Sequence, residues 1–363
     1  MPKPSKKKKE IPGKPTPERE AAPESAKKLE DYAQSEPFQL SLFRLLDLKP
    51  AEQQRYSNTI ELYDFMPKYH WGKVERIGGE FLRVLEREFE CKTIKYKIEI
   101  APAVITDSDG VKRYYYPSKR EELVEDALRR LATTEKGVFL DDQAGVTFTL
   151  YQLQQELKRT GHSYSIKELK DALLICNRTN ITVTTEDGKA VLSSNMFETL
   201  GLQTREDWKG TGQKTKAFVR FNSLVSEGIK TGAFRQLDYE KAMSYSSVIA
   251  RQFHKRMSHH FTQASISTRY EIKLSTIIRD FGLTAYTWIS QNLRDVESAL
   301  KEMKEKDIIL NYTTEKLLDA GQRNKLIDAK FTIMPHPNFS GGVIAANRRH
   351  ARIEKAVADQ SQK

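Results

Sequence analysis

One stretch of the sequence has the composition of a phosphate-binding loop. Gly210-Thr-Gly-Gln-Lys-Thr215 combines the glycines, lysine and threonine with which a Walker loop holds nucleotide phosphates. A Walker loop, however, needs a glycine directly before the lysine and a helix after it, so that backbone amides converge on the phosphate. Here Gln213 precedes Lys214, and the strand-like Ala217-Phe-Val-Arg-Phe221 follows. We therefore interpret the stretch as a flexible basic linker.

Histidines and tyrosines form two further groups that could do chemistry. His254, His259 and His260 share a predicted helix, but Ser258 stands where the second ligand of an i, i+4 zinc pair would be. We expect a basic helix face there, with a metal site as a remote alternative. The run Tyr114 to Tyr116 could supply the nucleophile of a DNA-nicking enzyme, yet the chain lacks the His-apolar-His pair of such enzymes. We therefore predict a non-enzymatic protein without cofactor or metal.

Charge and composition point to a polyanion as the partner. The 363 residues carry a formal net charge of +11, and length and composition allow two or three domains. Cys91 and Cys176 lie far apart in the sequence and belong to no metal-binding cluster, so we expect two reduced thiols. No apolar run approaches the ~20 residues of a membrane span, and the N-terminus lacks a secretory signal. We therefore expect a cytoplasmic protein without membrane contact.

Three capping boxes place helix starts in the middle of the chain. Each is a Ser or Thr followed three residues later by Glu or Gln: Ser118 with Glu121, Thr149 with Gln152, and Ser165 with Glu168. The third helix has an apolar stripe and is followed by the strand Ile181-Thr-Val-Thr-Thr185, which the turn Asp187-Gly188 leads back into Ala190-Val-Leu192. Helix, strand, helix, turn, helix and hairpin in this order predict a winged helix, with the hairpin as the wing.

The same plan recurs 127 residues later. A helix at about 245–262, a strand at 270–274 and a short helix capped by Ser275 precede a third helix and a hairpin of 308–312 with 329–334. The hairpin is expected to have a long basic tip. The apolar positions of the two copies correspond without a gap: Leu169 and Val296, Ala172 and Ala299, Leu173 and Leu300, Cys176 and Met303, Ile181 and Ile308, Val183 and Leu310. We interpret this correspondence as a shared structural pattern.

Two different segments precede these copies. Residues 1–36 are rich in Lys, Glu, Pro, Ala and Ser, which predicts a solvated tail or a non-specific phosphate-binding arm. Polar and apolar residues then alternate, as in Asn58-Thr-Ile-Glu-Leu-Tyr-Asp64 and Tyr96-Lys-Ile-Glu-Ile100, with a turn at Asp107 to Gly110. Period two predicts strands and hairpins, so we expect a small β-rich segment.

Two surfaces are predicted to contact DNA. Ten basic residues against three acidic ones between Lys209 and Arg256 suggest a basic bridge that holds phosphates between the two modules. Exposed polar residues early in the two third helices are the candidates for reading bases, although each alone could be an ordinary surface residue. The predicted contacts are Ser165, Lys167, Lys170, Arg178, Lys189, Lys214, Lys216, Arg251, Lys255, Ser290, Gln291, Arg294, Lys316, Arg323 and Lys325.

Between about Ser118 and His336 the chain resembles plasmid replication initiators of the Rep type, the double winged-helix, iteron-binding (TrfA-like) family. The resemblance rests on the two-module plan and on short stretches of sequence such as Ala250-Arg-Gln-Phe-His-Lys-Arg256 and Ile278-Arg-Asp-Phe-Gly-Leu283. It implies binding of double-stranded DNA at direct repeats of an origin, opening of an adjacent AT-rich stretch, and recruitment of the host initiator and replicative helicase. It also implies a homodimer as an inactive, repressing form.

Gln39-Leu40-Ser41-Leu42-Phe43 resembles the pentapeptide by which bacterial proteins dock on the polymerase sliding clamp. Leu42 and Phe43 would enter an apolar cleft of the clamp, while Gln39 fixes the orientation of the peptide. The alternative is an amphipathic helix from Leu40 to Leu48 that packs on the protein's own core.

The complete prediction is an α+β fold of two tandem winged-helix domains, preceded by a small β-rich segment and a disordered N-terminal tail. Its divisions are a tail (1–36), a clamp-binding-like peptide (37–48), a β-rich segment (49–117), winged-helix domains (118–236 and 237–338) and a basic C-terminal tail (339–363). The alternative functions are a winged-helix transcriptional repressor and a nicking Rep or relaxase.

Overall fold

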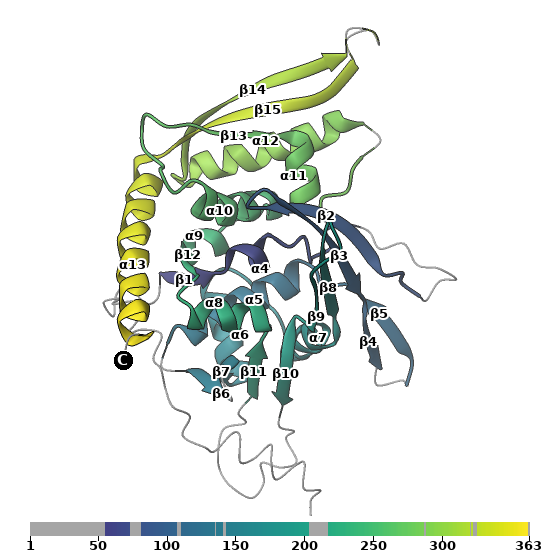
Figure 1. The fold of residues 1–363 in the computed structure, drawn as a ribbon. Coiled ribbons are helices and arrows are strands. Elements are labelled where there is room, and N and C mark those ends of the chain that lie inside the picture. Colours follow the sequence, from purple (N-terminus) through teal and green to yellow (C-terminus); the bar gives the residue numbers. More distant parts are fainter. Residues whose placement is uncertain are drawn as a thin grey trace, which may run out of the picture. The chain divides into compact units, whose positions relative to one another are not determined.

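The strands of this protein form several small sheets, and helices pack between them (Figure 1). The computed structural model describes residues 55–72, 81–106, 110–134, 136–140, 143–202, 217–286, 288–319, 321 and 325–361. The fold is therefore a mixture of α and β structure without one dominant sheet.

The segment before the first long helix is built into the rest of the fold. Its strands β1 and β3 pair antiparallel with β12 and β8 from later in the chain, whereas β4 and β5 pair with each other. The elements are β1 (Tyr56–Thr59), α4 (Glu61–Phe65), β2 (Leu85–Cys91), β3 (Ile94–Ala101), β4 (Ala103–Thr106) and β5 (Lys112–Tyr115). Most of these strands thus complete sheets that involve later parts of the sequence.

The strand predicted from Asn58 to Asp64 is wrong in its second half. The strand β1 ends at Thr59, and residues 61–65 form the short helix α4. A helical turn buries the consecutive residues Tyr63, Asp64 and Phe65, which one face of a strand cannot do. The carboxylate of Asp64 also accepts a hydrogen bond from the backbone N–H of Ile60 at 2.6 Å. Local bonding and burial therefore override the alternating pattern.

Module 1, which we define as residues 119–195, begins its helices where the capping boxes predict. The backbone N–H of Ser165 donates to Glu168 Oε2 at 2.7 Å, and the N–H of Glu168 donates to Ser165 Oγ at 3.2 Å. Thr149 and Gln152 form the same reciprocal pair. The elements are α5 (Lys119–Ala132), β6 (Gly137–Leu140), β7 (Gln143–Phe148), α6 (Leu150–Arg159), α7 (Ile166–Arg178), β8 (Asn180–Thr185) and β9 (Val191–Asn195).

The predicted hairpin of module 1 is confirmed, but it belongs to a larger sheet. Its strands β8 and β9 pair around Gly188, whose φ of +66° suits the turn. Two strands from the N-terminal segment extend the sheet to the order β2-β3-β8-β9. Elsewhere, a second four-stranded sheet has the order β10-β11-β7-β6. The elements that lead to the next module are β10 (Phe197–Leu202), β11 (Ala217–Phe221), α8 (Ser223–Lys230), β12 (Arg235–Asp238) and α9 (Tyr239–Met243).

Module 2, which we define as residues 248–335, has the order helix, strand, helix, helix and hairpin, and differs from module 1 in having one strand instead of two between its first two helices. The strands form a three-stranded sheet of order β13-β15-β14. The elements are α10 (Val248–His260), β13 (Tyr270–Lys273), α11 (Leu274–Asp280), α12 (Ile289–Glu305), β14 (Ile309–Asp319) and β15 (Lys325–Pro335). Ser275 does not cap α11 as predicted, because its hydroxyl donates to Asp328 Oδ2 at 2.7 Å and the helix already begins at Leu274.

The correspondence of the two modules holds for the predicted helix positions and ends in the first strand of the hairpin. Leu173 and Leu300 are both fully buried, as are Cys176 and Met303. Leu310, the predicted counterpart of buried Val183, is instead 43% exposed. An irregularity in pairing between Ile309 and Asn311 turns Ile309 into the core in its place.

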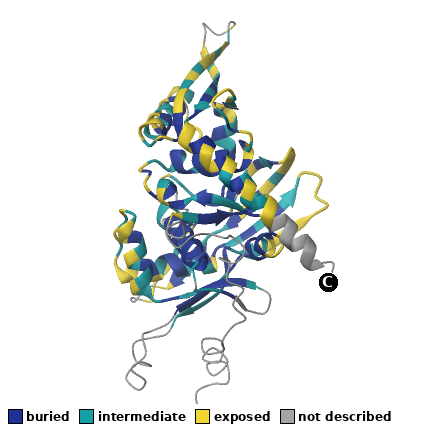
Figure 2. Ribbon diagram, turned by 90° about the vertical axis from the view of Figure 1, so that its left-hand side faces the viewer, coloured by how far each residue is buried: buried dark blue, intermediate teal, exposed yellow. Residues whose placement is uncertain are grey.

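Two large hydrophobic cores lie within the described residues, one around module 1 and the other in module 2 (Figure 2). The first also takes up Tyr63 and Phe65 of α4 and Phe89 of β2. The second includes Phe339 and Val343 at the beginning of α13 (Pro337–Ser361). The residues predicted as a C-terminal tail thus form a helix through Ser361 that begins within the second core.

Candidate nucleic-acid interface

The helix α12 of module 2 has one buried face and one exposed polar face. Its apolar residues, such as Val296 and Leu300, are fully buried. The opposite face exposes side chains at spacings of three and four residues, as expected for one side of a helix: Ser290, Arg294, Ser298 and Lys301. Ser290 and Arg294 were predicted from the sequence, whereas Ser298 and Lys301 were missed, although the same helical period would have found them.

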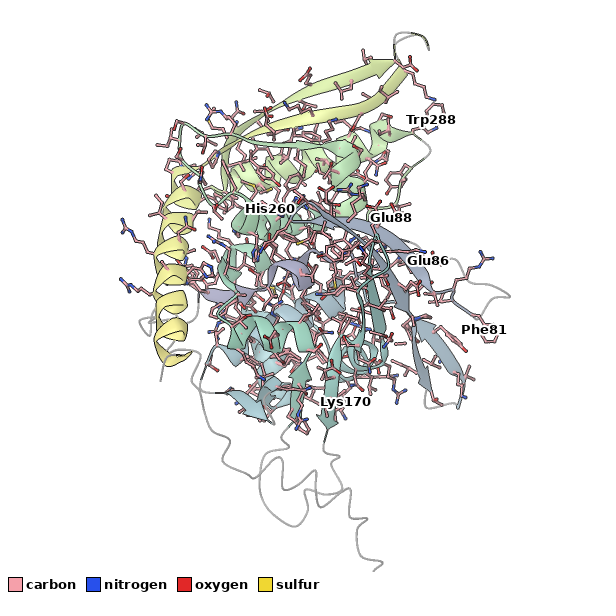
Figure 3. The ribbon with its side chains drawn as sticks, in the orientation of Figure 1. Phe81, Glu86, Glu88, Lys170, His260 and Trp288 are labelled. Atoms are coloured by element: carbon pink, nitrogen blue, oxygen red, sulfur yellow. The ribbon has the colours of Figure 1, made fainter. Side chains whose placement is uncertain are left out.

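The start of α12 is ordered by a small polar network. Gln291 is half-buried; its Nε2 donates to Asp295 Oδ1 at 2.8 Å, and its Oε1 accepts a hydrogen bond from Arg294 Nη2 at 2.7 Å. Trp288, at the N-cap position, is 74% exposed and stands at the surface (Figure 3). The network holds the guanidinium of Arg294 in place on the exposed face.

The helix α7 of module 1 is exposed in its first turns and again at Arg178, its last residue. Ser165, Lys167 and Lys170 are all exposed, and Lys170 points into solvent (Figure 3). In the second half of the helix Ile175 is buried against the hairpin of β4 and β5. The guanidinium of Arg178 donates from Nη1 to the carbonyl oxygen of Val104 in β4 at 2.8 Å. The predicted DNA contact Arg178 is thus already bonded to a neighbouring element.

The hairpins that follow the two helices carry exposed lysines. Lys189 lies after the turn between β8 and β9, and its Nζ is 3.1 Å from Asp187 Oδ2. Lys316 and Lys325 are exposed on β14 and β15, which pair as far as Asp319 and Lys325. These two lysines therefore lie in the strands and not in the predicted tip loop.

Arg251 and Lys255 are not available to DNA, and their prediction as contacts is wrong. Both are buried, and they bind carboxylates on α5. Arg251 Nη1 is 2.6 Å from Glu122 Oε2, and Lys255 Nζ is 3.1 Å from Glu122 and 2.8 Å from Asp126. Burial alone would raise the pKa of Glu122, but the two cations lower it. These side chains join the first helix of module 1 to the first helix of module 2.

The predicted basic bridge is also not a continuous surface within the described residues. Arg235 Nε donates to the carbonyl oxygen of Ser258 at 2.9 Å, and Lys241 Nζ donates to that of Lys306 at 2.7 Å. Arg256 forms an ion pair with Asp280 at 3.0 Å. These cations serve internal contacts, because each lies beside an acceptor from another element.

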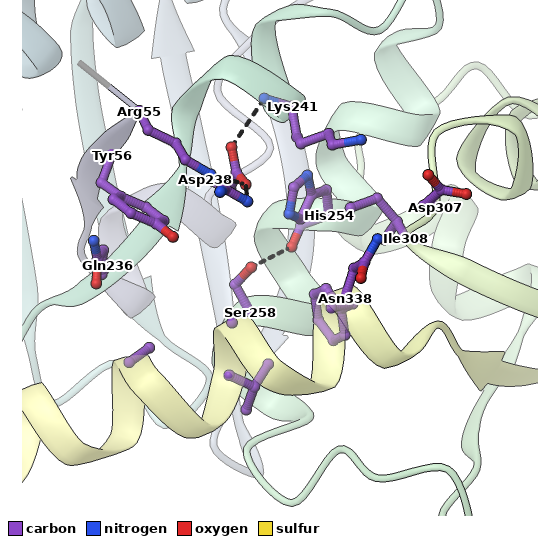
Figure 4. A pocket seen from close by; sticks show the side chains of 14 residues that line it. Arg55, Tyr56, Gln236, Asp238, Lys241, His254, Ser258, Asp307, Ile308 and Asn338 are labelled. Atoms are coloured by element: carbon purple, nitrogen blue, oxygen red, sulfur yellow. Dashed lines mark hydrogen bonds and ion pairs between the residues drawn. The ribbon is translucent and has the colours of Figure 1, made fainter. Parts of the chain in front are cut away.

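The helix α10 does not present the predicted basic face, because His254 and His259 are buried. Burial lowers the pKa of His254 to about 4 and that of His259 to about 3, so both rings are neutral at pH 7. His254 lines a cavity of about 60 Å³ beside α13, with Ser258 and Phe339 (Figure 4). Within the described residues, no group of His, Cys, Asp and Glu could hold a metal ion.

The remaining candidate residues either lie within strands or the core of the fold, or lie outside the described residues. Tyr114 is in β5, and the hydroxyl of Tyr116 donates to the carbonyl oxygen of Arg83. The two cysteines are free, as predicted, and both are buried. Outside the described residues lie the pentapeptide 39–43, the loop 210–215 and three predicted DNA contacts: Lys214, Lys216 and Arg323. No helix of the described part of the chain has the length and apolarity needed to cross a membrane.

Comparison with known proteins gives weak similarities of fold. The sequence matches no protein-family model and no curated protein. A structure of domains 2 and 3 of RctB is similar over 79% of this chain and 98% of that chain, at 11% identity and a TM-score of 0.47. A Pi initiator protein in complex with iteron DNA is similar over 60% and 91%, at 13% identity and a TM-score of 0.42. Similarities of this size leave the function to be argued from the surface of this chain.

Proposed function

We propose that this protein is a non-enzymatic, sequence-specific double-stranded DNA-binding protein that initiates plasmid replication, of the TrfA-like Rep type. In this proposal modules 1 and 2 are tandem winged helices, α7 and α12 enter major grooves, and the hairpins β8–β9 and β14–β15 are the wings. The protein would bind direct repeats of an origin in the bacterial cytoplasm.

The observation that carries the proposal is the pairing of α12 with the hairpin that follows it. A helix whose inner face is buried and whose outer face offers Ser290, Arg294, Ser298 and Lys301 can read base edges and hold phosphates. The adjoining strands are 11 residues each, and only Ile309 of β14 and the part of β15 from Ala329 onward contribute buried side chains to the core. The outer part, with Lys316 and Lys325, is free to lie along a duplex.

The dependence of DNA binding on salt concentration provides a test of this arrangement. Each phosphate that a lysine or arginine neutralises contributes about −0.9 to the slope of log K against log salt concentration. Binding through both modules and both wings should therefore weaken steeply as salt rises. A protein that reads bases must in addition prefer particular sequences at moderate salt.

The decisive experiment selects duplexes from a random pool with the purified full-length chain. We expect enrichment of a motif that recurs as direct repeats beside an AT-rich stretch in the DNA flanking the reading frame. Failure to prefer any sequence over random DNA at moderate salt would refute the proposal. Binding only to an inverted repeat at a promoter, without support of an origin in cells, would favour the repressor instead.

The absence of enzymatic activity has its own test. Supercoiled DNA that carries the selected repeats is incubated with the protein and Mg²⁺ and analysed for open circles. We expect no nicking, because Tyr114 and Tyr115 are strand residues within the β4–β5 hairpin. Nicking that Tyr115→Phe abolishes would show that the protein is an enzyme.

The proposed protein partners rest on the sequence resemblance. We propose that Gln39 to Phe43 docks on the bacterial sliding clamp, and that the host initiator, the replicative helicase and a second copy of the chain are further partners. Leu42→Ala with Phe43→Ala should abolish capture on immobilised clamp, whereas the matched pair Leu45→Ala with Leu46→Ala should not. If both double variants lower the melting temperature equally, the stretch is instead a helix of the protein's own core.

A further inference from the structure

The hairpin of β4 and β5 covers part of the helix that module 1 would present to DNA. Ala103 and Ile105 of β4 are buried together with Ile175 of α7. Leu174 is half-buried in the same cluster, and Arg178 donates to the carbonyl oxygen of Val104. The hairpin is thus bonded to the second half of α7 by apolar packing and by a hydrogen bond.

This contact lies on the side of α7 that faces away from the core. The core-facing residues of the helix are Leu169, Ala172, Leu173 and Cys176. At 100° per residue, Leu174 and Arg178 lie on the opposite side, in line with the exposed Lys167, which is about two turns before Leu174. Any duplex that meets the first turns of α7 must therefore also meet the hairpin.

The hairpin turns a distinct face outward. Along β4, Ala103 and Ile105 are buried, while Thr106 is exposed. Because side chains alternate across a strand, Val104 shares the outward face with Thr106. The residues that pair with these two in β5, Tyr114 and Lys112, lie on the same face. The ring of Tyr114 is 5.2 Å from that of Phe81, which is 54% exposed. The two strands carry no acidic side chain, and of their two cations Lys112 lies on the outward face, whereas Arg113, the partner of Ile105, lies on the other face.

We propose that the outward face of the β4–β5 hairpin is a DNA-binding surface that acts together with the first turns of α7. A major groove admits a two-stranded ribbon as well as a helix, so a helix start with a ribbon stacked behind it fits the same duplex. Lys112 and the hydroxyl of Tyr114 contact phosphate oxygens at the border of the groove, as lysines and tyrosines do in other DNA complexes. Module 1 thus reads DNA with a composite of helix and hairpin.

This inference rests on the proposed function, and its test uses the duplex selected with the wild-type full-length chain. Lys112→Ala should reduce the magnitude of the salt slope by about 0.9, because one phosphate contact is lost. Tyr114→Phe keeps the ring beside Phe81 and removes only the hydroxyl. It should shorten the hydroxyl-radical footprint at the module 1 end and leave the module 2 end unchanged. Lys230→Ala, an exposed lysine at the end of α8, is the matched control and should change neither quantity.

The outcomes separate this inference from the proposed function. If the wild-type chain prefers no duplex, the proposed function itself fails. If Lys167→Ala lowers the salt slope while Lys112→Ala and Tyr114→Phe leave slope and footprint at wild-type values, the hairpin inference alone is overturned. Thermal unfolding of each variant tests whether the fold is retained. We expect that it is retained in Lys112→Ala and Tyr114→Phe, because the side chains of Lys112 and Tyr114 lie on the outward face of the hairpin.

Discussion

The helices α7 and α12 occupy the same place in two modules of similar element order, yet their outer faces have different surroundings. On α12 the exposed face continues from Ser290 to Lys301. On α7 the hairpin β4–β5 packs on Leu174 and Ile175, and the exposed Arg178 is bonded to Val104 of the same hairpin. Equivalent helices in one chain can therefore offer surfaces of different length, because a segment from outside the repeated plan packs on one of them.

The first helices of the modules differ in a complementary way. The buried charges of α5 include the carboxylates of Glu122 and Asp126, whereas those of α10 include the cations of Arg251 and Lys255. Each helix alone would leave buried charges without partners, which is strongly unfavourable. The difference explains why the two helices bind each other. We therefore expect substitutions in this contact between α5 and α10 to reduce stability more than any of the other changes that we predict.

The largest expected effect comes from breaking the contact between α5 and α10. Glu122→Ala leaves Arg251 and Lys255 without their shared carboxylate and should lower the free energy of unfolding by about 3–5 kcal/mol. The control Glu186→Ala removes an exposed pair with Lys95 and should cost at most about 1 kcal/mol. Urea unfolding measures both. Equal losses of unfolding free energy in the two variants would show that the ion pairs between α5 and α10 do not hold the modules together.

A slightly smaller effect should appear when the pH is lowered. His254 has a pKa of about 4 in the fold against about 6.5 in an unfolded chain, so it favours the unfolded state as pH falls. Its contribution to stability is complete above pH 6.5 and should fall by about 3 kcal/mol on approach to pH 4. Asp238, Lys241 and Lys255 are the charged groups that act on it.

The measurement is urea unfolding at pH 7 and pH 5 for the wild type and for His254→Gln. The variant cannot take up the proton and should therefore show a weaker pH dependence than the wild type. The same pH dependence in both proteins would contradict a buried neutral imidazole at this position of α10.

The free outer face of α12 predicts an effect on DNA binding at a position whose counterpart in α7 is packed against the hairpin β4–β5. Lys301→Ala should reduce the magnitude of the salt slope by about 0.9, because this lysine is exposed in the fourth turn of α12. Leu174, its counterpart in α7, is half-buried in the hairpin contact, so Leu174→Ala should change stability rather than the slope. Quantitative binding at several salt concentrations distinguishes the two results. If Leu174→Ala reduced the slope and Lys301→Ala did not, the outer face of α7, and not that of α12, would be the one that contacts DNA at this position.

The smallest difference between the two modules is expected in their hairpins. Lys189 already lies 3.1 Å from Asp187, whereas the cross-strand neighbour of Lys316 is Ala329. Lys316→Ala should therefore lower the salt slope by about 0.9, and Lys189→Ala by less than half of that. Equal slopes for the two variants would show that the wings contribute alike despite their different surroundings.

Local patterns predicted much of the two modules. The boxes that begin at Thr149 and Ser165 form as expected, because the bonds they need connect residues three apart in the chain. Helix period alone also located Lys167, Lys170 and Arg294 on exposed faces. The sequence could not reveal the burial of Arg251 and Lys255, since a basic residue on a helix has the same local pattern whether it meets solvent or a carboxylate from a distant helix.

By itself, then, the sequence determined where α5, α6 and α7 begin, where the hairpin β8–β9 turns and which residues of α7 and α12 form the buried stripe, because these depend on neighbours within a few positions. Only the tertiary structure decided which polar faces remain free. The pairing of Glu122 with Arg251 joins residues 129 positions apart, and the bond between Arg178 and Val104 joins residues 74 positions apart. Contacts over such separations depend on how the elements pack, and they determine which basic residues are left to meet DNA.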